Sequence, residues 1–96
     1  MKTIEEVISE ISKVKHPAID YPLIDLGIVK KVDLENDIAH VTFAFPFPNI
    51  PIADQLLNSI AIPVNQLGLE FQYRIELMTD EERDKFMRME AEAWIG

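Results

Sequence analysis

The side chains best suited to chemistry in this sequence are two histidines, one of which has acidic residues close by. His16 is followed by Asp20 and Asp25 in a stretch that also contains two prolines. An imidazole and two carboxylates are suitable ligands for a divalent metal ion. No regular helix or strand is expected to fix their spacing, so a metal-binding protein or small enzyme built on these three residues is an alternative and not the first hypothesis. His40 is expected on the solvent-facing side of a strand.

The residue types missing from the chain narrow its chemistry further. The 96 residues contain no cysteine, which excludes disulfides, thiolate nucleophiles and any metal or iron–sulfur site held by thiolates of this chain. No glycine-rich phosphate loop, serine nucleophile elbow or HExxH pattern occurs. The formal net charge of −8 disfavours nucleic acids, because neutralising phosphates needs a basic surface. We therefore expect an acidic, non-enzymatic protein without a bound cofactor.

The most unusual segment runs from Phe45 to Pro51 and reads Phe-Pro-Phe-Pro-Asn-Ile-Pro. Prolines stiffen a loop, so apolar side chains on it lose little conformational entropy when they bind a partner. The alternative is that Phe45 and Phe47 only close the end of the hydrophobic core. The sequence alone leaves a binding loop and a core plug as two open interpretations.

Six elements are expected to position these segments. Thr3 and Glu6 have the spacing of a capping box, which predicts a helix that ends by about Val14. β-Branched and aromatic residues then predict two strands joined by a polar turn. An apolar repeat predicts a second helix, kinked or broken at Pro63, and another capping box opens the last helix. The expected ranges after the first helix are 28–34, 38–45, 51–67, 69–77 and 80–94.

Two strands carry more detailed predictions. The alternation in segment 69–77 is the most regular in the chain and predicts one buried and one solvent-facing side. Its apolar residues, expected to be buried, are Leu69, Phe71, Tyr73, Ile75 and Leu77. In the first strand, Lys30 falls in phase with two apolar residues, which indicates either a β-bulge or an inward-leaning charge at a sheet edge.

The order helix–strand–strand–helix–strand–helix predicts an α/β (α+β) fold of two layers, with helices on one face of a small mixed sheet. The second and third strands should run parallel, because a helix connects them. The length fits a single domain over residues 1–96. Neither a signal-peptide core nor an apolar run of about 18 residues occurs, so we expect a cytoplasmic protein outside the membrane.

The segments KHPAIDYPLIDLGIVKKV and FPFPNIPIADQL resemble a family of small iron–sulfur cluster assembly domains that includes SufT and PaaD-like proteins. The resemblance runs from the first helix through the third strand, and the family's α/β fold has the same order of elements. The family's motifs are Asp-Pro-Glu, acidic-Leu-Gly-hydrophobic-Val and Thr-x-Pro-x-Cys-Pro. The matching residues of this chain are Pro17, Asp25, Leu26, Gly27, Val29, Pro48 and Pro51.

The chain departs from these motifs at four polar positions. His16, Ala18, Pro46 and Ile50 stand where the motifs have Asp, Glu, Thr and Cys, respectively. A cysteine at the start of a helix has a lowered pKa and can act as a reactive thiolate or metal ligand, whereas isoleucine can do neither. The resemblance therefore implies an iron–sulfur assembly scaffold that lacks the family's thiol.

The first hypothesis is thus an accessory or adaptor protein related to iron–sulfur cluster assembly, which binds protein partners and does not itself hold a cluster. The partners that the resemblance implies are assembly factors or client proteins. The candidate contact residues are Phe45, Pro46, Phe47, Pro48, Asn49, Ile50, Pro51, His16 and Asp25. A further alternative is a structural homo-oligomer, whose symmetric contacts are made by the proline loop or by Met87, Met89 and Trp94 of the last helix.

Overall fold

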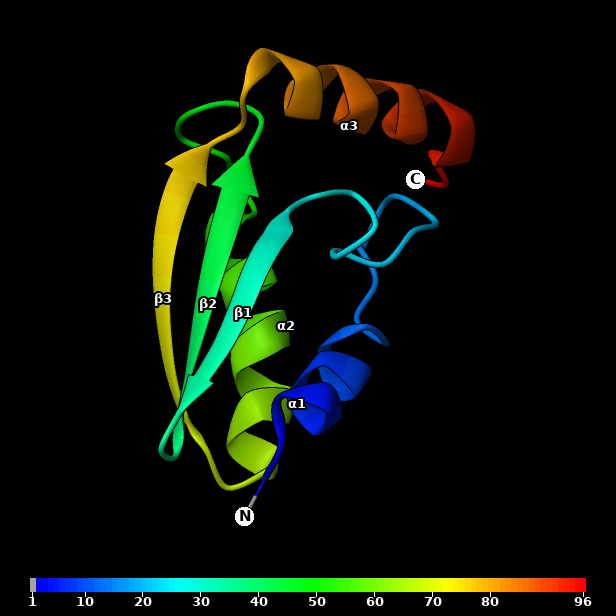
Figure 1. The fold of residues 1–96 in the computed structure, drawn as a ribbon. Helices are drawn as coiled ribbons and strands as arrows, with labels where there is room; N and C mark the ends of the chain where they lie inside the picture. Colours follow the sequence, from blue (N-terminus) through cyan, green and yellow to red (C-terminus); the bar gives the residue numbers. More distant parts are fainter. Residues whose placement is uncertain (1) are drawn as a thin grey trace.

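The computed structural model describes residues 2–96, which form a three-stranded sheet and three helices (Figure 1). In chain order the elements are α1 (Ile4–Ile11), β1 (Val29–Glu35), β2 (Ile38–Phe45), α2 (Ala53–Gln66), β3 (Glu70–Leu77) and α3 (Asp80–Ala93). The predicted order and the α+β class are confirmed, and the predicted boundaries differ from these by only a few residues. None of the helices in residues 2–96 is long and apolar enough to span a membrane.

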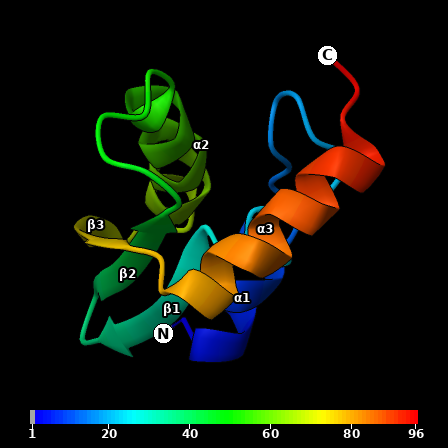
Figure 2. The same ribbon diagram turned by 90° about the horizontal axis from the view of Figure 1, so that it is seen from above.

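The sheet has the order β1-β2-β3, with β2 in the centre. β2 runs antiparallel to β1 and parallel to β3, as expected for two strands that a helix connects. Helices α1 and α2 lie on the same face of the sheet, whereas α3 crosses above the end where β2 and β3 finish (Figures 1 and 2). The third helix therefore closes one end of the two-layer body.

The core lies between the sheet and its two covering helices. Its fully buried side chains include Val7 and Ile11 of α1, Val41 and Phe43 of β2, and Leu56, Ile60 and Val64 of α2. Both predicted capping boxes form: the Glu6 N–H donates to Thr3 Oγ1 at 3.2 Å, and the Glu82 N–H donates to Thr79 Oγ1 at 3.2 Å. The starts of α1 and α3 are thus fixed by local sequence.

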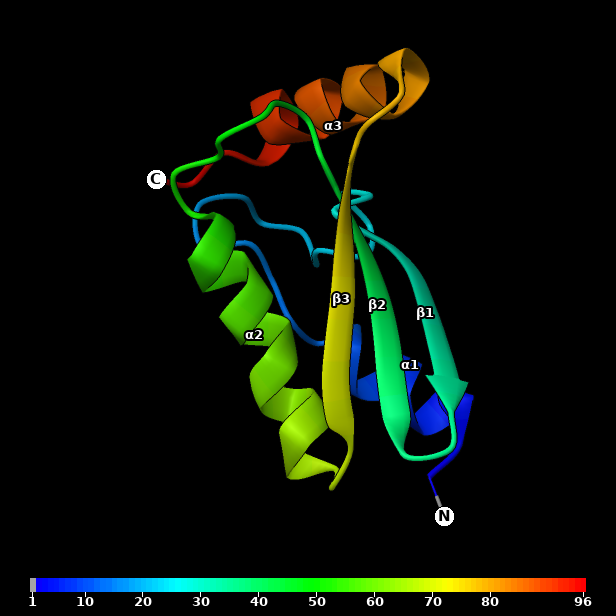
Figure 3. The same ribbon diagram turned by 90° about the vertical axis from the view of Figure 1, so that its left-hand side faces the viewer.

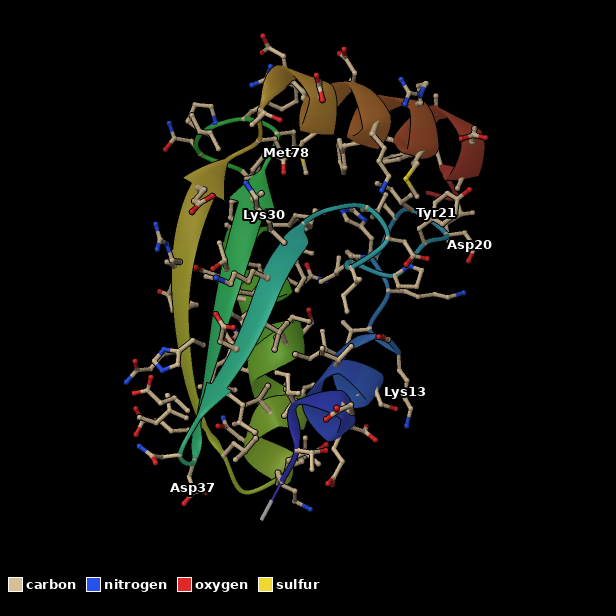
Figure 4. All side chains as sticks on the ribbon, in the orientation of Figure 1. Lys13, Asp20, Tyr21, Lys30, Asp37 and Met78 are labelled. Carbon is tan, nitrogen blue, oxygen red and sulfur yellow. The ribbon has the colours of Figure 1, made fainter. Side chains whose placement is uncertain are left out.

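The bulge predicted from the phase of Lys30 is present. The pairing of β1 with β2 shifts register between Val29 and Lys31, which frees Lys30 to face solvent. Its Nζ lies 3.3 Å from carboxylate oxygens of both Glu76 and Glu82. Hydrogen bonds to Glu82 and Glu76 raise the pKa of Lys30 above its usual value. Lys30 marks the beginning of β1, beside the other two strands (Figure 4).

Of the kink or break predicted at Pro63, the break is absent, because α2 continues through this residue. The proline removes one backbone hydrogen bond. However, Leu56 and Ile60 before it and Val64 after it are all buried in the same core. Packing of this apolar face against the sheet maintains the helix across the missing bond.

The prediction that one side of β3 is buried is wrong for three of its residues. Tyr73, Ile75 and Leu77 are 53%, 48% and 56% exposed, respectively. Their register with β2 places them on the face that carries the helices, so the alternation itself is correct. However, β3 is an edge strand, and α2 lies near its beginning but diverges from its end (Figure 3). The helix layer therefore leaves the second half of this apolar stripe uncovered.

Candidate functional site

The proline-rich segment forms a loop that leaves the sheet and passes beneath α3. β2 ends at Phe45, because Pro46 and Pro48 have no N–H to donate to a neighbouring strand. Asn49 adopts a left-handed conformation with φ of 59°, which turns the chain toward α2. The N-cap residue of α2, Ile52, makes no side-chain capping bond. The loop thus joins the end of the sheet to the open start of a helix.

Arg83 of α3 fastens this loop to the rest of the molecule. Its Nε donates to the Pro46 carbonyl at 2.9 Å, and its Nη2 donates to the Met78 carbonyl at 3.4 Å. The guanidinium carbon also lies 5.9 Å from the centre of the Phe47 ring, within the range of a cation–π contact. One side chain therefore holds the beginning of the loop against the first turn of α3.

The other end of α3 is attached to the loop that precedes β1. The Asp20 N–H donates to the Ala93 carbonyl at 2.9 Å, and the Ile95 N–H donates to the Ala18 carbonyl at 3.0 Å. Asp20 and its neighbour Tyr21 lie below the C-terminal end of the helix (Figure 4). Between the two attachments, Phe86 is buried. α3 is thereby held at both ends and in the middle.

These three segments surround a pocket of about 480 Å³ beneath α3. This volume is within the range of sites that bind small molecules or recess a partner's side chain. The polar side chains of its lining are His16, Gln55 and Glu90. Most of the remaining wall is apolar and includes Phe45, Phe47, Ile50, Phe86 and Trp94. The pocket therefore favours an apolar group with a small number of polar contacts.

His16 has a defined protonation state in this wall. Its Nδ1 accepts a hydrogen bond from the Ala18 N–H at 3.0 Å, so the ring proton of the neutral form is on Nε2. Burial lowers the pKa of His16 below its usual value, and the Glu90 carboxylate partly opposes this by raising it. At neutral pH the pocket therefore contains an uncharged imidazole with one N–H to donate.

The structure brings together most of the nine residues predicted to contact a partner. Six of them line the pocket beneath α3: His16, Phe45, Pro46, Phe47, Ile50 and Pro51. Pro48 and Asn49 line a second hollow of about 310 Å³ on the β3 side of the same loop, where Ile75 and Leu77 also lie. Asp25 is exposed and lines neither space. The structure therefore places His16 on one surface with the loop but does not bring Asp25 to it.

The alternative metal site built on His16, Asp20 and Asp25 finds no support in this arrangement. Asp20 Oδ1 pairs with Lys15 Nζ at 2.9 Å on the exposed surface. Among residues 2–96, no group of three or more histidine and acidic side chains is close enough to hold a metal ion. The pocket itself contributes one imidazole and one carboxylate and no thiolate, which does not fit the four ligands of an iron–sulfur cluster.

Residues of α3 are the part of the site that sequence reasoning missed. Arg83, Phe86 and Glu90 all reach the loop or the pocket, but nothing in the sequence connects them to segment 45–51. The one available signal was Glu90, an acidic residue within the apolar stripe of the last helix. Trp94, which the sequence indicated as a candidate contact of a homo-oligomer, lines the pocket while 57% exposed.

Comparison with known families identifies the scaffold. Residues 4–70 match the family model described as iron-sulfur cluster assembly protein. This chain belongs to that family. The matched segment contains the loop before β1 and the proline-rich loop. These two loops form walls of the pocket beneath α3 and carry the residues that resemble the family's motifs. β3 beyond its first residue and all of α3 lie outside the match.

A solved structure supports the fold of this assembly domain independently. The chain is similar to the crystal structure of a domain of unknown function, DUF59, from Bacillus anthracis, with a TM-score of 0.62 and 16% sequence identity. The alignment covers 88% of this chain and 89% of the DUF59 chain. At this identity the similarity establishes the fold alone. No curated protein matches the sequence.

Proposed function

We propose that this member of the iron–sulfur assembly family is a non-enzymatic accessory protein, which binds a protein partner at the pocket beneath α3. On this proposal the partner is a cytoplasmic assembly factor or client of the SufT and PaaD-like type, and the cluster is held by ligands from elsewhere. The observation that carries the proposal is Ile50. By its resemblance to the family motif it stands in place of the motif's cysteine, and it lines a mostly apolar pocket.

The physical character of the pocket favours a protein contact. Phe47 and Trp94 are 47% and 57% exposed, and large aromatic side chains contribute disproportionately to the free energy of protein association. Arg83 and three prolines hold Phe47 in a fixed loop, which reduces the entropy lost when a partner binds. Rigid, exposed aromatic groups around a recess are typical of a docking site.

A capture experiment with matched variants tests this proposal. Tagged full-length chain is expressed in its native organism as wild type, as Phe47→Asp and as Ile62→Asp. Ile62 is 57% exposed on α2 and lines no described pocket, so it controls for an added surface charge. We expect wild type and Ile62→Asp to recover an iron–sulfur assembly factor or client, and Phe47→Asp to lose it while keeping its circular dichroism spectrum. Equal recovery by Phe47→Asp, or no such partner for wild type, would contradict the proposal.

The absence of thiolates leads to a separate expectation about iron. After anaerobic incubation with ferrous iron and sulfide followed by desalting, the chain should retain no stoichiometric iron or acid-labile sulfide. Elemental analysis and the visible absorption spectrum measure both quantities. A cluster bound in a fixed ratio to the isolated chain would mean that other donors replace cysteine, and the accessory role without a cluster would then be wrong.

A further inference from the structure

The outer edge of β3 has unpaired backbone groups along its length. The Glu70 N–H donates to the Asp37 carbonyl and the Met78 N–H donates to the Phe45 carbonyl, both at 2.8 Å, so the even-numbered residues of β3 face β2. Because successive residues of a strand direct their N–H and C=O groups to opposite sides, the odd-numbered residues 71–77 face outward. Within residues 2–96, no other element crosses in front of this edge (Figure 3). It can accept another strand.

The two edges of the sheet differ in how they are protected. At the β1 edge, a bulge interrupts the ladder and charged residues follow one another closely, including Lys30, Lys31, Asp33 and Glu35. Bulges and charges are the usual means by which edge strands avoid pairing with other chains. β3 pairs with β2 without any register shift and contains no proline. β3 also carries charged residues, namely Glu70, Arg74 and Glu76, but it lacks a bulge, so the β1 edge is the better protected of the two.

The uncovered side chains of β3 extend the apolar face of the sheet up to the open edge. Tyr73, Ile75 and Leu77 lie opposite the buried Val41, Phe43 and Phe45 of β2. All three are about half exposed or more, because α2 diverges from them. A strand added to the edge would cover this stripe on one side while it satisfies the backbone.

We propose that the occupant of this edge is β3 of a second copy of the same chain, paired antiparallel about a twofold axis at Ile75. In this register Ile75 faces Ile75 of the partner, and Tyr73 faces the partner's Leu77. These outward-facing residues form the hydrogen-bonded pairs, each of which exchanges two backbone bonds. On the other face of the sheet, Arg74 lies opposite the partner's Glu76, and the twofold axis repeats that contact. The contact is thus self-complementary in backbone, apolar and charged groups.

Neighbouring registers lack this complementarity. An axis one residue later brings Glu76 opposite itself, and an axis one residue earlier brings Arg74 opposite itself. An axis two residues earlier places Glu70 opposite Glu76, and like charges directly across a ladder are destabilising. An axis three residues earlier pairs Glu70 with Arg74 but leaves Leu77 beyond the end of the partner's strand. The axis at Ile75 satisfies the charges and covers all three exposed apolar side chains.

The result would be a continuous six-stranded sheet with both helix layers on the same face. In the single chain, Arg74 Nη2 lies 3.2 Å from Glu76 Oε2, and the Arg74 side chain is 73% exposed. On dimerisation this arginine can exchange its contact within the chain for one across the interface. The interface is formed by β3, so this inference does not rest on the proposed function, although Phe47 lines both the pocket beneath α3 and the hollow beside Ile75 and Leu77.

A charge-exchange experiment tests both the contact and its register. Arg74→Glu and Glu76→Arg each convert two attractive cross-strand pairs into repulsive ones, and each should weaken dimerisation about tenfold or more. An equimolar mixture of the two variants should restore the dimer, because the acid introduced at position 74 then faces the base introduced at position 76. Light scattering and sedimentation equilibrium of the full chain measure the mass. Arg88→Glu and Glu92→Arg on α3 carry the same charge changes and should dimerise like wild type.

Ile75→Lys gives a second, independent readout, because it places two like charges on the twofold axis. Ile75 is 48% exposed, so this substitution is expected to leave the fold intact, as circular dichroism would verify. Wild type that stays monomeric at the highest attainable concentration would overturn the proposal. So would a dimer that survives Ile75→Lys, or two folded monomeric variants that fail to associate when mixed.

Discussion

Arg83 shows how one residue can unite segments that are distant in the sequence. Its guanidinium group joins α3 to the start of the proline loop and contacts the ring of Phe47. The side chain is about one-third exposed, so its hydrogen bonds to main-chain carbonyls are only partly shielded from water. Phe47 is the residue that the capture experiment changes, and the position of its ring depends on Arg83.

Replacing Arg83 by alanine should therefore destabilise the protein and loosen the loop. We expect the free energy of unfolding to fall by about 1–3 kcal/mol, because two carbonyl oxygens lose a charged donor. Arg83→Lys should recover only a small part of this loss. A compact ammonium group cannot donate to both carbonyls at once, and it lacks the planar surface with which the guanidinium group covers the Phe47 ring. Urea denaturation at neutral pH measures the change. Stability of Arg83→Lys equal to wild type would show that charge alone matters.

The protonation of His16, in the wall of the pocket, makes the free energy of unfolding depend on pH. Its folded-state pKa is lowered, so the unfolded chain binds the proton more readily than the folded protein does. The free energy of unfolding should therefore be fully retained above about pH 6.5 and decrease as the pH falls from there through the lowered folded-state pKa. Protonation would also add a hydrogen to Nδ1, the atom that now accepts the Ala18 N–H.

This dependence is measurable with His16→Asn, which cannot titrate but retains an acceptor oxygen close to the position of Nδ1. The urea midpoints of wild type and variant should differ above about pH 6.5 and approach each other as the pH falls below that value. Glu90→Gln should lower the pKa of His16 further, as monitored by NMR titration, because the carboxylate raises it. A wild-type imidazole that titrates above 6.5 would contradict the assigned environment.

At the scale of elements, α3 determines whether the pocket exists. The helix is joined to the proline loop by Arg83, to the loop before β1 through Asp20 and Ile95, and to the core by Phe86. It lies across the end of the sheet instead of covering a face (Figure 2). A helix attached through so few buried groups should open more readily than α2, which buries one whole side.

Phe86→Ala isolates the apolar part of this attachment. Phe86 is 5% exposed, and we expect its truncation to cost about 3–5 kcal/mol, as for other buried phenylalanines. Amide hydrogen exchange should accelerate more in α3 than in α2, since the core helix keeps its own contacts. The control is Met87→Ala, because Met87 lies on the same helix but is 42% exposed. Uniform acceleration across both helices would indicate that α3 does not open separately.

The elements also show what the sequence could and could not predict. Capping boxes and alternation are local, so Thr3, Thr79 and the pattern of segment 69–77 predicted where helices and strands occur. The burial of Tyr73 depended on strand order and on the tilt of α2, neither of which is a local property. Likewise the loop at Phe47 was recognised from its own composition, whereas Arg83 lies 37 residues from Pro46 and could be placed only by the fold.

At the scale of the whole molecule, the net charge of −8 should govern how two copies meet. High net charge of one sign keeps proteins monomeric through long-range repulsion. The screening length falls from about 30 Å at 0.01 M salt to about 8 Å at 0.15 M. A close pair such as Arg74 with the partner's Glu76 is screened less, because its two charges lie much closer together than the screening length.

Raising the salt concentration over this range should therefore strengthen the β3–β3 dimer, although its specific polar contacts are ionic. Sedimentation equilibrium at several ionic strengths would give the dissociation constant. Weaker association at higher salt would mean that the local ion pairs outweigh the overall repulsion. Arg74 and Glu76 would then have to contribute most of the binding free energy, and the charge-exchange variants would have to lose most of it.

The attachment of Ile95 to Ala18 also has a consequence for synthesis of the chain. His16 and Trp94 face the same pocket, although almost the whole chain separates them. During translation the sheet and its two covering helices can assemble first, and the pocket can close only after residue 95 has left the ribosome. A partner that recognises the closed pocket would consequently not bind nascent or truncated chains. It would bind only chains in which α3 has docked and the pocket has closed.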